Sequence, residues 1–346
     1  MPVAILWKMG IHSPGLRGFS ETMITIELLL CPISSPIESD EALPFAISLA
    51  QAHGAQLVLC SCVSLPVFIS PAANIPSEAR TRMLLKDALM HCFGDQLKKL
   101  NWRIALGDAR EGIGEEIVRV ACESHADLIV MRSRRSRVPA LLGSIAEQVS
   151  RTALCPVLIT RSLGRESHVN GQARFQRILV PHDFSGASEL ALSYALSIAQ
   201  KLKAELHLLH VVPEQEDQHS EISLPPPDGT FYREIQRLHD CVPEQIHRSL
   251  KLKAVVRSGK PYREVLTYSK QHGADLICMG ALGRDFGLGA LFGSNVDRVL
   301  RQADCPVLIA QPLKLALHSV NTRIFKPHLR DGRHTFDSKR SQSVSS

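Results

Sequence analysis

The same stretch of sequence occurs twice in this chain, about 150 residues apart. Residues 143–160 read GSIAEQVSRTALCPVLIT and residues 293–310 read GSNVDRVLRQADCPVLIA, identical at 10 of 18 positions. Shorter matches upstream keep nearly the same offset, and this period is too long for a solenoid repeat. The sequence therefore predicts two copies of one domain, each with its own core.

The matches set the expected boundaries of the chain's parts. The two domain copies are predicted at residues 23–162 and 174–313, joined by a polar linker at 163–173. Residues 1–22 have little structural pattern and are predicted to be a flexible extension, or to precede a translation start at Met23. Residues 314–346 are poor in apolar side chains and are predicted to be a disordered basic tail.

Charge and composition exclude several classes of protein. The formal net charge of the 346 residues is +6, but the tail and the first 22 residues hold all of it. A neutral body disfavours a nucleic-acid binder. No apolar run is long enough to span a bilayer, and no signal peptide is visible, which predicts a cytoplasmic protein with no membrane contact. The nine cysteines include no CxxC pair and are expected to be reduced, packed thiols.

Strand-sized apolar runs alternate with helical patterns in the second copy. Nearly uniform apolar strands separated by helices indicate a parallel sheet covered on both faces, which is a doubly wound α/β fold with five strands in each copy. Ligands of such sheets bind beyond the carboxyl ends of the strands. Strands are expected at 178–180, 205–212, 252–257, 275–279 and 306–310, and helices at 185–202, 233–250, 262–272 and 295–302.

A glycine-rich loop follows the fourth strand of the second copy and ends at a helix start. Glycines let backbone N–H groups approach phosphates, and the helix dipole favours their negative charge. Asp183, after the first strand, can accept hydrogen bonds from a base or ribose. On spacing alone, a nucleotide site and a purely structural loop are equally supported.

The pattern Gly280-x2-Gly283-x9-Gly293-Ser294 resembles the ATP-binding signature of the universal stress protein family. Pro-x-Asp after the first strand and CPVLI after the last helix also resemble that family, and the likeness covers both copies. The resemblance implies a five-stranded α/β domain that binds ATP, with Mg²⁺ accompanying the triphosphate. The residues it implies are Pro181, His182, Asp183 and Val211 near adenine and ribose, Met279, Gly280 and Gly283 along the ribose–phosphate path, and Gly293, Ser294 and Asn295 at the phosphates.

The first copy departs from this pattern. Ser34 stands in place of Asp183, Arg132 in place of Gly280, and the loop that follows is two residues shorter. The first copy is therefore predicted to have lost its ATP site. Its loop holds four arginines in residues 132–137, a candidate site for a phosphorylated or acidic partner, although a solvated basic loop is the favoured interpretation.

The evidence for metal binding is weak at two pairs of candidate ligands. His207 and His210 fall on opposite faces of a strand, so they should not ligate one ion. Cys60 and Cys62 share a face but align with apolar residues of the second copy, which favours packing over metal binding. The polar insertion at 213–230 is a candidate flap over the site.

Together with the family resemblance, these observations predict an ATP-binding stress-response module that acts by binding or signalling through an unidentified protein partner. No residue is placed to position an attacking water, so at most slow ATP hydrolysis is expected and the protein is not predicted to be an enzyme. The alternative is a protein-interaction scaffold of the same fold that binds no nucleotide. The resemblance also implies that the last strands, 156–160 and 306–310, pair within the chain as a pseudo-dimer, or across a homodimer, which would cover their exposed edges.

Overall fold

The computed structural model describes the greater part of both domain copies. The described residues are 24–33, 37, 40–63, 77–110, 112–133, 143–161, 168–169, 172–173, 175–213, 229–281 and 293–311. The predictions for the N-terminal extension, the basic tail, most of the 213–230 insertion and most of the arginine loop lie outside them, as do Ser34 and Gly283.

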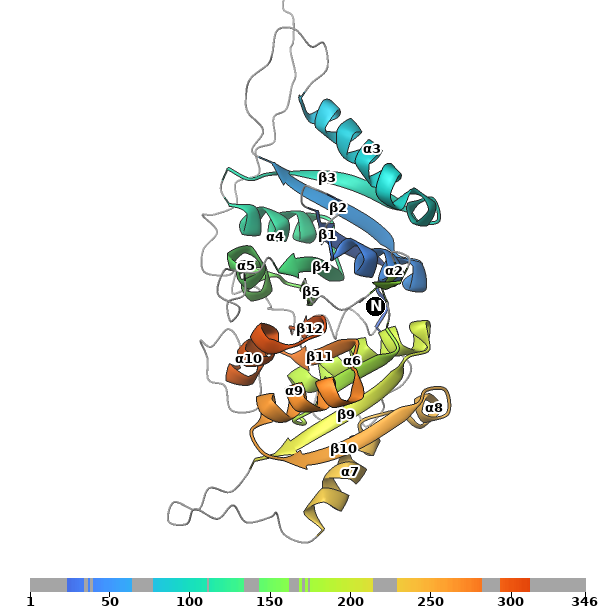
Figure 1. The fold of residues 1–346 in the computed structure, drawn as a ribbon, viewed down its shortest axis with the longest axis vertical. Coiled ribbons are helices and arrows are strands. Elements are labelled where there is room, and N and C mark those ends of the chain that lie inside the picture. Colours follow the sequence, from blue (N-terminus) through green and yellow to red (C-terminus); the bar gives the residue numbers. More distant parts are fainter. Residues whose placement is uncertain are drawn as a thin grey trace, which may run out of the picture. The chain divides into compact units, whose positions relative to one another are not determined.

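The strands of both copies join into one ten-stranded sheet (Figure 1). Its order is β10-β9-β8-β11-β12-β5-β4-β1-β2-β3, and neighbouring strands are parallel except where β12 meets β5. Each copy thus repeats one doubly wound order, as predicted. The strands are β1 (Leu28–Pro32), β2 (Gln56–Val63), β3 (Trp102–Asp108), β4 (Leu128–Ser133) and β5 (Val157–Arg161), then β8 (Arg177–Pro181), β9 (Glu205–Val212), β10 (Leu252–Ser258), β11 (Leu276–Gly280) and β12 (Val307–Ala310).

Helices cover both faces of the sheet (Figure 1). Two apolar cores result, one on each face, and each contains residues of both copies. One face carries α2 (Leu43–His53), α3 (Ser77–Leu97), α6 (Gly186–Leu202), α7 (Thr230–Asp240) and α8 (Glu244–His247). The other carries α4 (Ile113–Glu123), α5 (Ser144–Thr152), α9 (Pro261–His272) and α10 (Ser294–Gln302).

The single helix predicted at 233–250 is wrong, because the chain forms two helices there. The first, α7, ends at Asp240, and the short α8 follows Pro243. Proline has no backbone N–H and pushes the preceding residue out of the helical region. Val242, just before it, is buried in the core between the two helices.

The two copies meet through their last strands, as predicted for an intrachain pseudo-dimer. β5 and β12 are antiparallel, with Leu158 opposite Leu308. Both leucines are fully buried, so neither copy leaves this edge open. The linker adds a feature that the sequence did not predict, a small hairpin of β6 (His168–Val169) and β7 (Gln172–Ala173). The Ala173 N–H donates to Ser48 Oγ of α2 at 3.1 Å, which ties the hairpin to the first copy.

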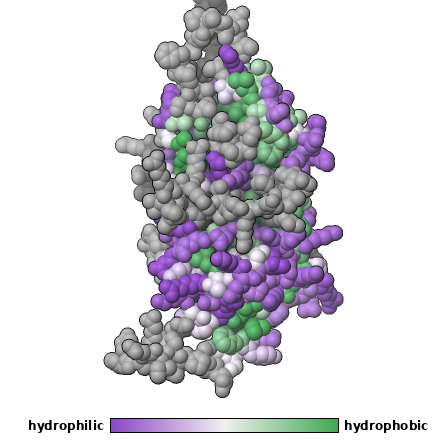
Figure 2. Space-filling model, in the orientation of Figure 1, coloured by the Kyte–Doolittle hydropathy of each residue, from purple (hydrophilic) through white to green (hydrophobic). Residues whose placement is uncertain are grey.

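Apolar side chains also reach the surface on two helices near the outer strands (Figure 2). Met83 and Leu84 on α3, and Phe231 and Tyr232 on α7, are all exposed. Among the helices of the described residues, none has the length and apolarity needed to cross a bilayer.

Candidate functional site

The candidate site of the second copy lies where β8 and β11 end side by side. These two strands are neighbours, and their onward connections lead to different parts of the sheet, the arrangement at which open α/β sheets bind ligands. Asp183, two residues after β8, uses Oδ1 to accept hydrogen bonds from the Ser185 N–H (3.0 Å) and Ser185 Oγ (2.6 Å). Ser185 in turn caps α6 through a capping box with Ser188. The carboxylate is thereby fixed beside the start of a helix.

His182 fastens the loop after β8 to the neighbouring strand. Its N–H donates to Leu209 O at 2.8 Å, and its carbonyl accepts from His210 Nδ1 at 2.7 Å. The ring is only 2% exposed and its Nδ1 accepts from the Phe184 N–H at 3.2 Å. These contacts hold His182 and its loop against the end of β9.

Phe184 has an unusual backbone conformation that the sequence did not predict. Its φ is 61°, in the region that bulky side chains rarely adopt. The ring lies against His182 and His210, and the Arg237 guanidinium of α7 sits 3.9 Å from its centroid. Such strain persists only where the surroundings hold it and is common near ligand sites.

Gly280 lets the end of β11 approach the first turn of α6. A Cβ at this position would lie 2.5 Å from the carbonyl carbon of Ala187, closer than such atoms ever come. The first copy has Arg132 here, and its helix α2 begins at Leu43. At the repeat spacing of 149, that start is six residues later than Gly186, the start of α6. In the second copy, the early start of α6 therefore requires a glycine at the end of β11.

We expect Gly280→Ala to lower the free energy of unfolding by about 1–3 kcal/mol, since the backbone of α6 must move to admit the methyl group. Arg132→Ala at the matching position of the first copy is the control and should cost less than Gly280→Ala, because it adds no atoms against a neighbouring backbone. Urea unfolding of the two variants compares them. Equal stability of Gly280→Ala and the wild type would contradict the close approach.

The helix start at α10 supplies the backbone groups that phosphates prefer. Gly293 is the N-cap and has no side chain, so no side-chain hydrogen bond caps this helix. The Gly293 N–H donates to Ala281 O at 3.0 Å, which joins the helix start to the end of β11. Ser294 is exposed and Asn295 partly so. First-turn N–H groups with adjacent hydroxyl and amide donors make an anion-binding arrangement.

The remaining predicted site residues that the structure describes also sit at the carboxyl ends of strands. Pro181 ends β8, Val211 lies near the end of β9, and Met279 near the end of β11. Val211 and Pro181 are half-buried, while Met279 is buried. The fold therefore brings the predicted residues to one edge of the sheet, apart from Gly283, which lies outside the described part.

A basic cluster beside α10 was not predicted. Arg298 of α10 lies over the Tyr262 ring of α9 at 4.5 Å from its centroid, and Arg263 Nε donates to Tyr262 Oη at 2.9 Å. The hydrogen bond from Arg263 lowers the pKa of Tyr262. Lys260, the N-cap of α9, is exposed next to it. The positive charges would favour an anion at this end of the sheet.

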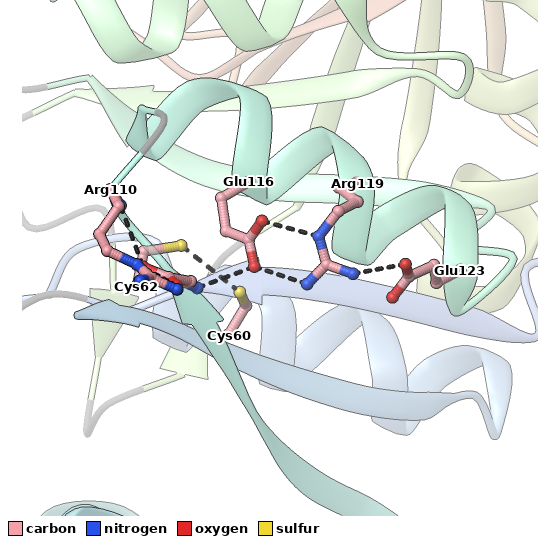
Figure 3. A network of polar contacts seen from close by, with 7 residues as sticks. Cys60, Cys62, Arg110, Glu116, Arg119 and Glu123 are labelled. Carbon is pink, nitrogen blue, oxygen red and sulfur yellow. Dashed lines mark hydrogen bonds and ion pairs between the residues drawn. The ribbon is translucent and has the colours of Figure 1, made fainter. Parts of the chain in front are cut away.

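The first copy holds a different polar network at its corresponding edge (Figure 3). The Glu116 carboxylate of α4 is 7% exposed and accepts hydrogen bonds from Arg119 Nε (2.7 Å), Arg119 Nη2 (2.6 Å) and the Asp108 N–H (2.8 Å). The guanidinium, which also pairs with Glu123, holds the pKa of Glu116 below its ordinary value. The i,i+3 spacing of Glu116 and Arg119 is the sequence signal that could have revealed the pair.

The equivalent carboxylate of the second copy has another partner. Glu264, like Glu116, is the fourth residue of its helix, but it pairs with Arg257 from β10, with Nη1 to Oε2 at 3.3 Å. Strand registers place Gly107 of β3 where Arg257 stands. A Cβ on Gly107 would lie 2.7 Å from Glu116 Cγ and 3.1 Å from Cys62 Sγ. In the first copy a carboxylate and a thiol therefore lie where the second copy has the side chain of the strand arginine.

Cys60 and Cys62 of β2 adjoin this network (Figure 3). Their sulfur atoms are 3.8 Å apart, with Cys60 fully buried and Cys62 half-buried. The hydrogen bond between the thiols, together with burial, raises the pKa of Cys60, and the same hydrogen bond lowers the pKa of Cys62. All nine cysteines are free.

The two candidate histidines take separate partners. His207 Nε2 lies 2.9 Å from Glu205 Oε1, and its Nδ1 lies 2.9 Å from Tyr268 Oη, whereas His210 binds the loop after β8. Burial lowers the pKa of His207. Within the described ranges, no three His, Cys, Asp or Glu side chains are grouped to hold a metal.

Comparisons with known proteins agree on one family. The model of the "Universal stress protein family" matches residues 26–161 and 174–311. A universal stress protein of Mycolicibacterium smegmatis is 24% identical over 300 residues, covering 82% of this chain and 97% of the relative. One from Methanocaldococcus jannaschii is 28% identical over 153 residues, covering 42% of this chain and 87% of the relative. A solved universal stress protein of Archaeoglobus fulgidus, 19% identical, has a TM-score of 0.58 and covers 84% of this chain and 100% of its own.

Proposed function

Because the chain belongs to the universal stress protein family, with two domains of that family in tandem, we propose that it is an ATP-binding stress-response module whose second domain holds the nucleotide. The supporting observation is that Asp183, Gly280 and the uncapped start of α10 meet at one edge of the sheet. In this proposal the protein acts in the cytoplasm by binding or signalling, through a protein partner that is not identified.

Each part of the nucleotide has a group suited to it. The Asp183 carboxylate and the backbone around Val211 would hold adenine and ribose at the ends of β8 and β9. The backbone N–H groups of Ser294 and Asn295, with their side chains, would hold the phosphates. Lys260 and Arg298 add positive charge beside them. These donors suit a charged phosphate chain.

Mg²⁺ would be held chiefly by the phosphates. No group of three metal-ligating side chains occurs in the described part of the chain, and Mg²⁺ commonly keeps several waters and takes few protein ligands when it accompanies a nucleotide. The donors described here bind and orient an anion. None of them is placed as a base, so any ATP turnover would be slow.

In this proposal the first domain has lost the nucleotide site. Arg132 stands in place of Gly280, and at the repeat spacing α2 starts six residues later than α6. Gly143 is the N-cap of α5, as Gly293 is of α10. The Gly143 N–H donates to the Ser133 hydroxyl at 3.1 Å, whereas the Gly293 N–H donates to the backbone carbonyl of Ala281.

The direct test is whether the purified full chain carries or takes up ATP. Protein isolated without added nucleotide is unfolded, and the released small molecules are identified by absorbance and mass spectrometry. Stripped protein is then titrated with Mg²⁺ and ATP. Released or tightly bound ATP supports the proposal, whereas no release and no binding by a folded chain would favour the nucleotide-free scaffold.

A further inference from the structure

The thiol pair of the first copy is placed to act as a chelate. Cys60 and Cys62 alternate with Ser61 along β2, so both side chains stand on the face covered by α4. Their sulfur atoms are 3.8 Å apart, so small rotations of the two side chains would bring both within bonding reach of one atom. A single bridging atom could therefore bind both.

The same geometry disfavours a disulfide between the two thiols. Two residues on the same face of a strand have Cα atoms about 6.6–6.8 Å apart, at the upper end of the range of about 4.4–6.8 Å that disulfides span. Both thiols are free, and β2 is paired with β1 on one side and β3 on the other. The reduced pair is the form that can take a bridging atom.

The surroundings of the thiols select against a divalent cation. Structural and catalytic zinc sites use three or four protein ligands, and the described residues offer no third His, Cys, Asp or Glu grouped with the pair. The nearest carboxylate, Glu116, is already held by two hydrogen bonds from Arg119. The guanidinium adds a positive charge beside the site.

We propose that Cys60 and Cys62 form a binding site for trivalent arsenic compounds, a site separate from the nucleotide site of the second domain. An arsenic(III) oxide group, R–As=O, condenses with the two thiols to R–As(S-Cys)₂ and water. Two As–S bonds form as the As=O bond breaks, and both thiol protons leave with the oxygen. Arsenic stays trivalent, nothing is oxidised, and a neutral adduct forms beside Arg119.

The second copy has no such pair. Leu209 and Val211 occupy the positions of Cys60 and Cys62, and Arg257 occupies that of Gly107. A side chain at Gly107 would press against Cys62 Sγ and Glu116 Cγ, so the glycine is what admits the thiol at this position. Cys62 is only half-buried, which gives a reagent a path to the sulfur.

Phenylarsine oxide and the full-length protein test this proposal. We expect one phenylarsenic group per chain by native mass spectrometry, resistant to a monothiol and removed by a dithiol. Cys62→Val, which installs the second-copy residue, and Cys60→Ala should each weaken binding at least about 100-fold, because a one-point attachment loses the chelate advantage. Cys241→Ala, at a half-buried cysteine of the other copy, should bind like the wild type.

Several results would overturn the proposal. They are retention of the adduct in both Cys60 and Cys62 variants, its location on other cysteines by peptide mapping, or no adduct on a folded wild type. Circular dichroism of each variant establishes that it is folded, and either of the two variants suffices if the other unfolds.

Discussion

Ser294→Glu should weaken ATP binding by about 100-fold or more while leaving the fold intact. The new carboxylate would lie at the first turn of α10, where the phosphates are proposed to bind. Two like charges about 4 Å apart cost about 4 kcal/mol at the effective dielectric near a protein surface, and Mg²⁺ would screen part of this. An acidic residue in a first helical turn stabilises the helix by about 0.3–1 kcal/mol, so the loss would not come from unfolding.

The matched control is Ser144→Glu at the same position of α5 in the first copy. Both serines are exposed and each follows an N-cap glycine. ATP affinity, measured by calorimetry on both variants and the wild type, should fall only for Ser294→Glu. A comparable loss of affinity in Ser144→Glu would mean that the nucleotide also binds the first copy. Unchanged affinity in both variants would show that the phosphates do not bind at the first turn of α10.

Leu158→Ala and Leu308→Ala should each lower the free energy of unfolding by about 3 kcal/mol. Both side chains are fully buried, face the same core and stand opposite each other where β5 meets β12. Removing a buried leucine loses its transfer free energy and leaves a cavity. Because the two leucines are neighbours, the double variant should cost less than the sum of the singles by at least about 0.5 kcal/mol.

Leu206 provides the comparison for that cycle. It is fully buried in the same core but lies on β9, four strands away from β5 in the sheet order. Leu158→Ala combined with Leu206→Ala should be additive within about 0.5 kcal/mol in urea unfolding. Additivity for Leu158 with Leu308 as well would contradict the pairing of the two copies through these strands.

The sequence predicted the fold well because its signals are local and repeated. The apolar runs that become β8, β9 and β11 alternate with helical patterns. Because the sequence repeats, the elements predicted in one copy can be compared with those predicted in the other. The pairing of β5 with β12 was predicted from the family resemblance and from the exposed edges that the last strands would otherwise leave. The break in the helix predicted at 233–250 was missed, because that prediction did not take Pro243 into account.

The site was predictable as a set of residues but not as a set of contacts. Glycine spacing identified Gly280, yet its approach to Ala187 depends on where α6 starts, a tertiary property. Asp183 was predicted to be a ligand residue, but its hydrogen bond from Ser185 could not be predicted from the sequence. In the second copy Arg257 of a strand pairs with the helix carboxylate, whereas in the first copy Gly107 takes the strand position and Arg119 of the helix pairs with the carboxylate. Patterns within single elements do not reveal this change of partner.

The central claim is that one copy of this tandem chain binds ATP and the other does not. Calorimetric titration of the full chain, stripped of nucleotide, with ATP in the presence of Mg²⁺ measures the number of sites directly. We expect one ATP bound per chain. Two bound per chain, or none on a folded protein, would contradict it.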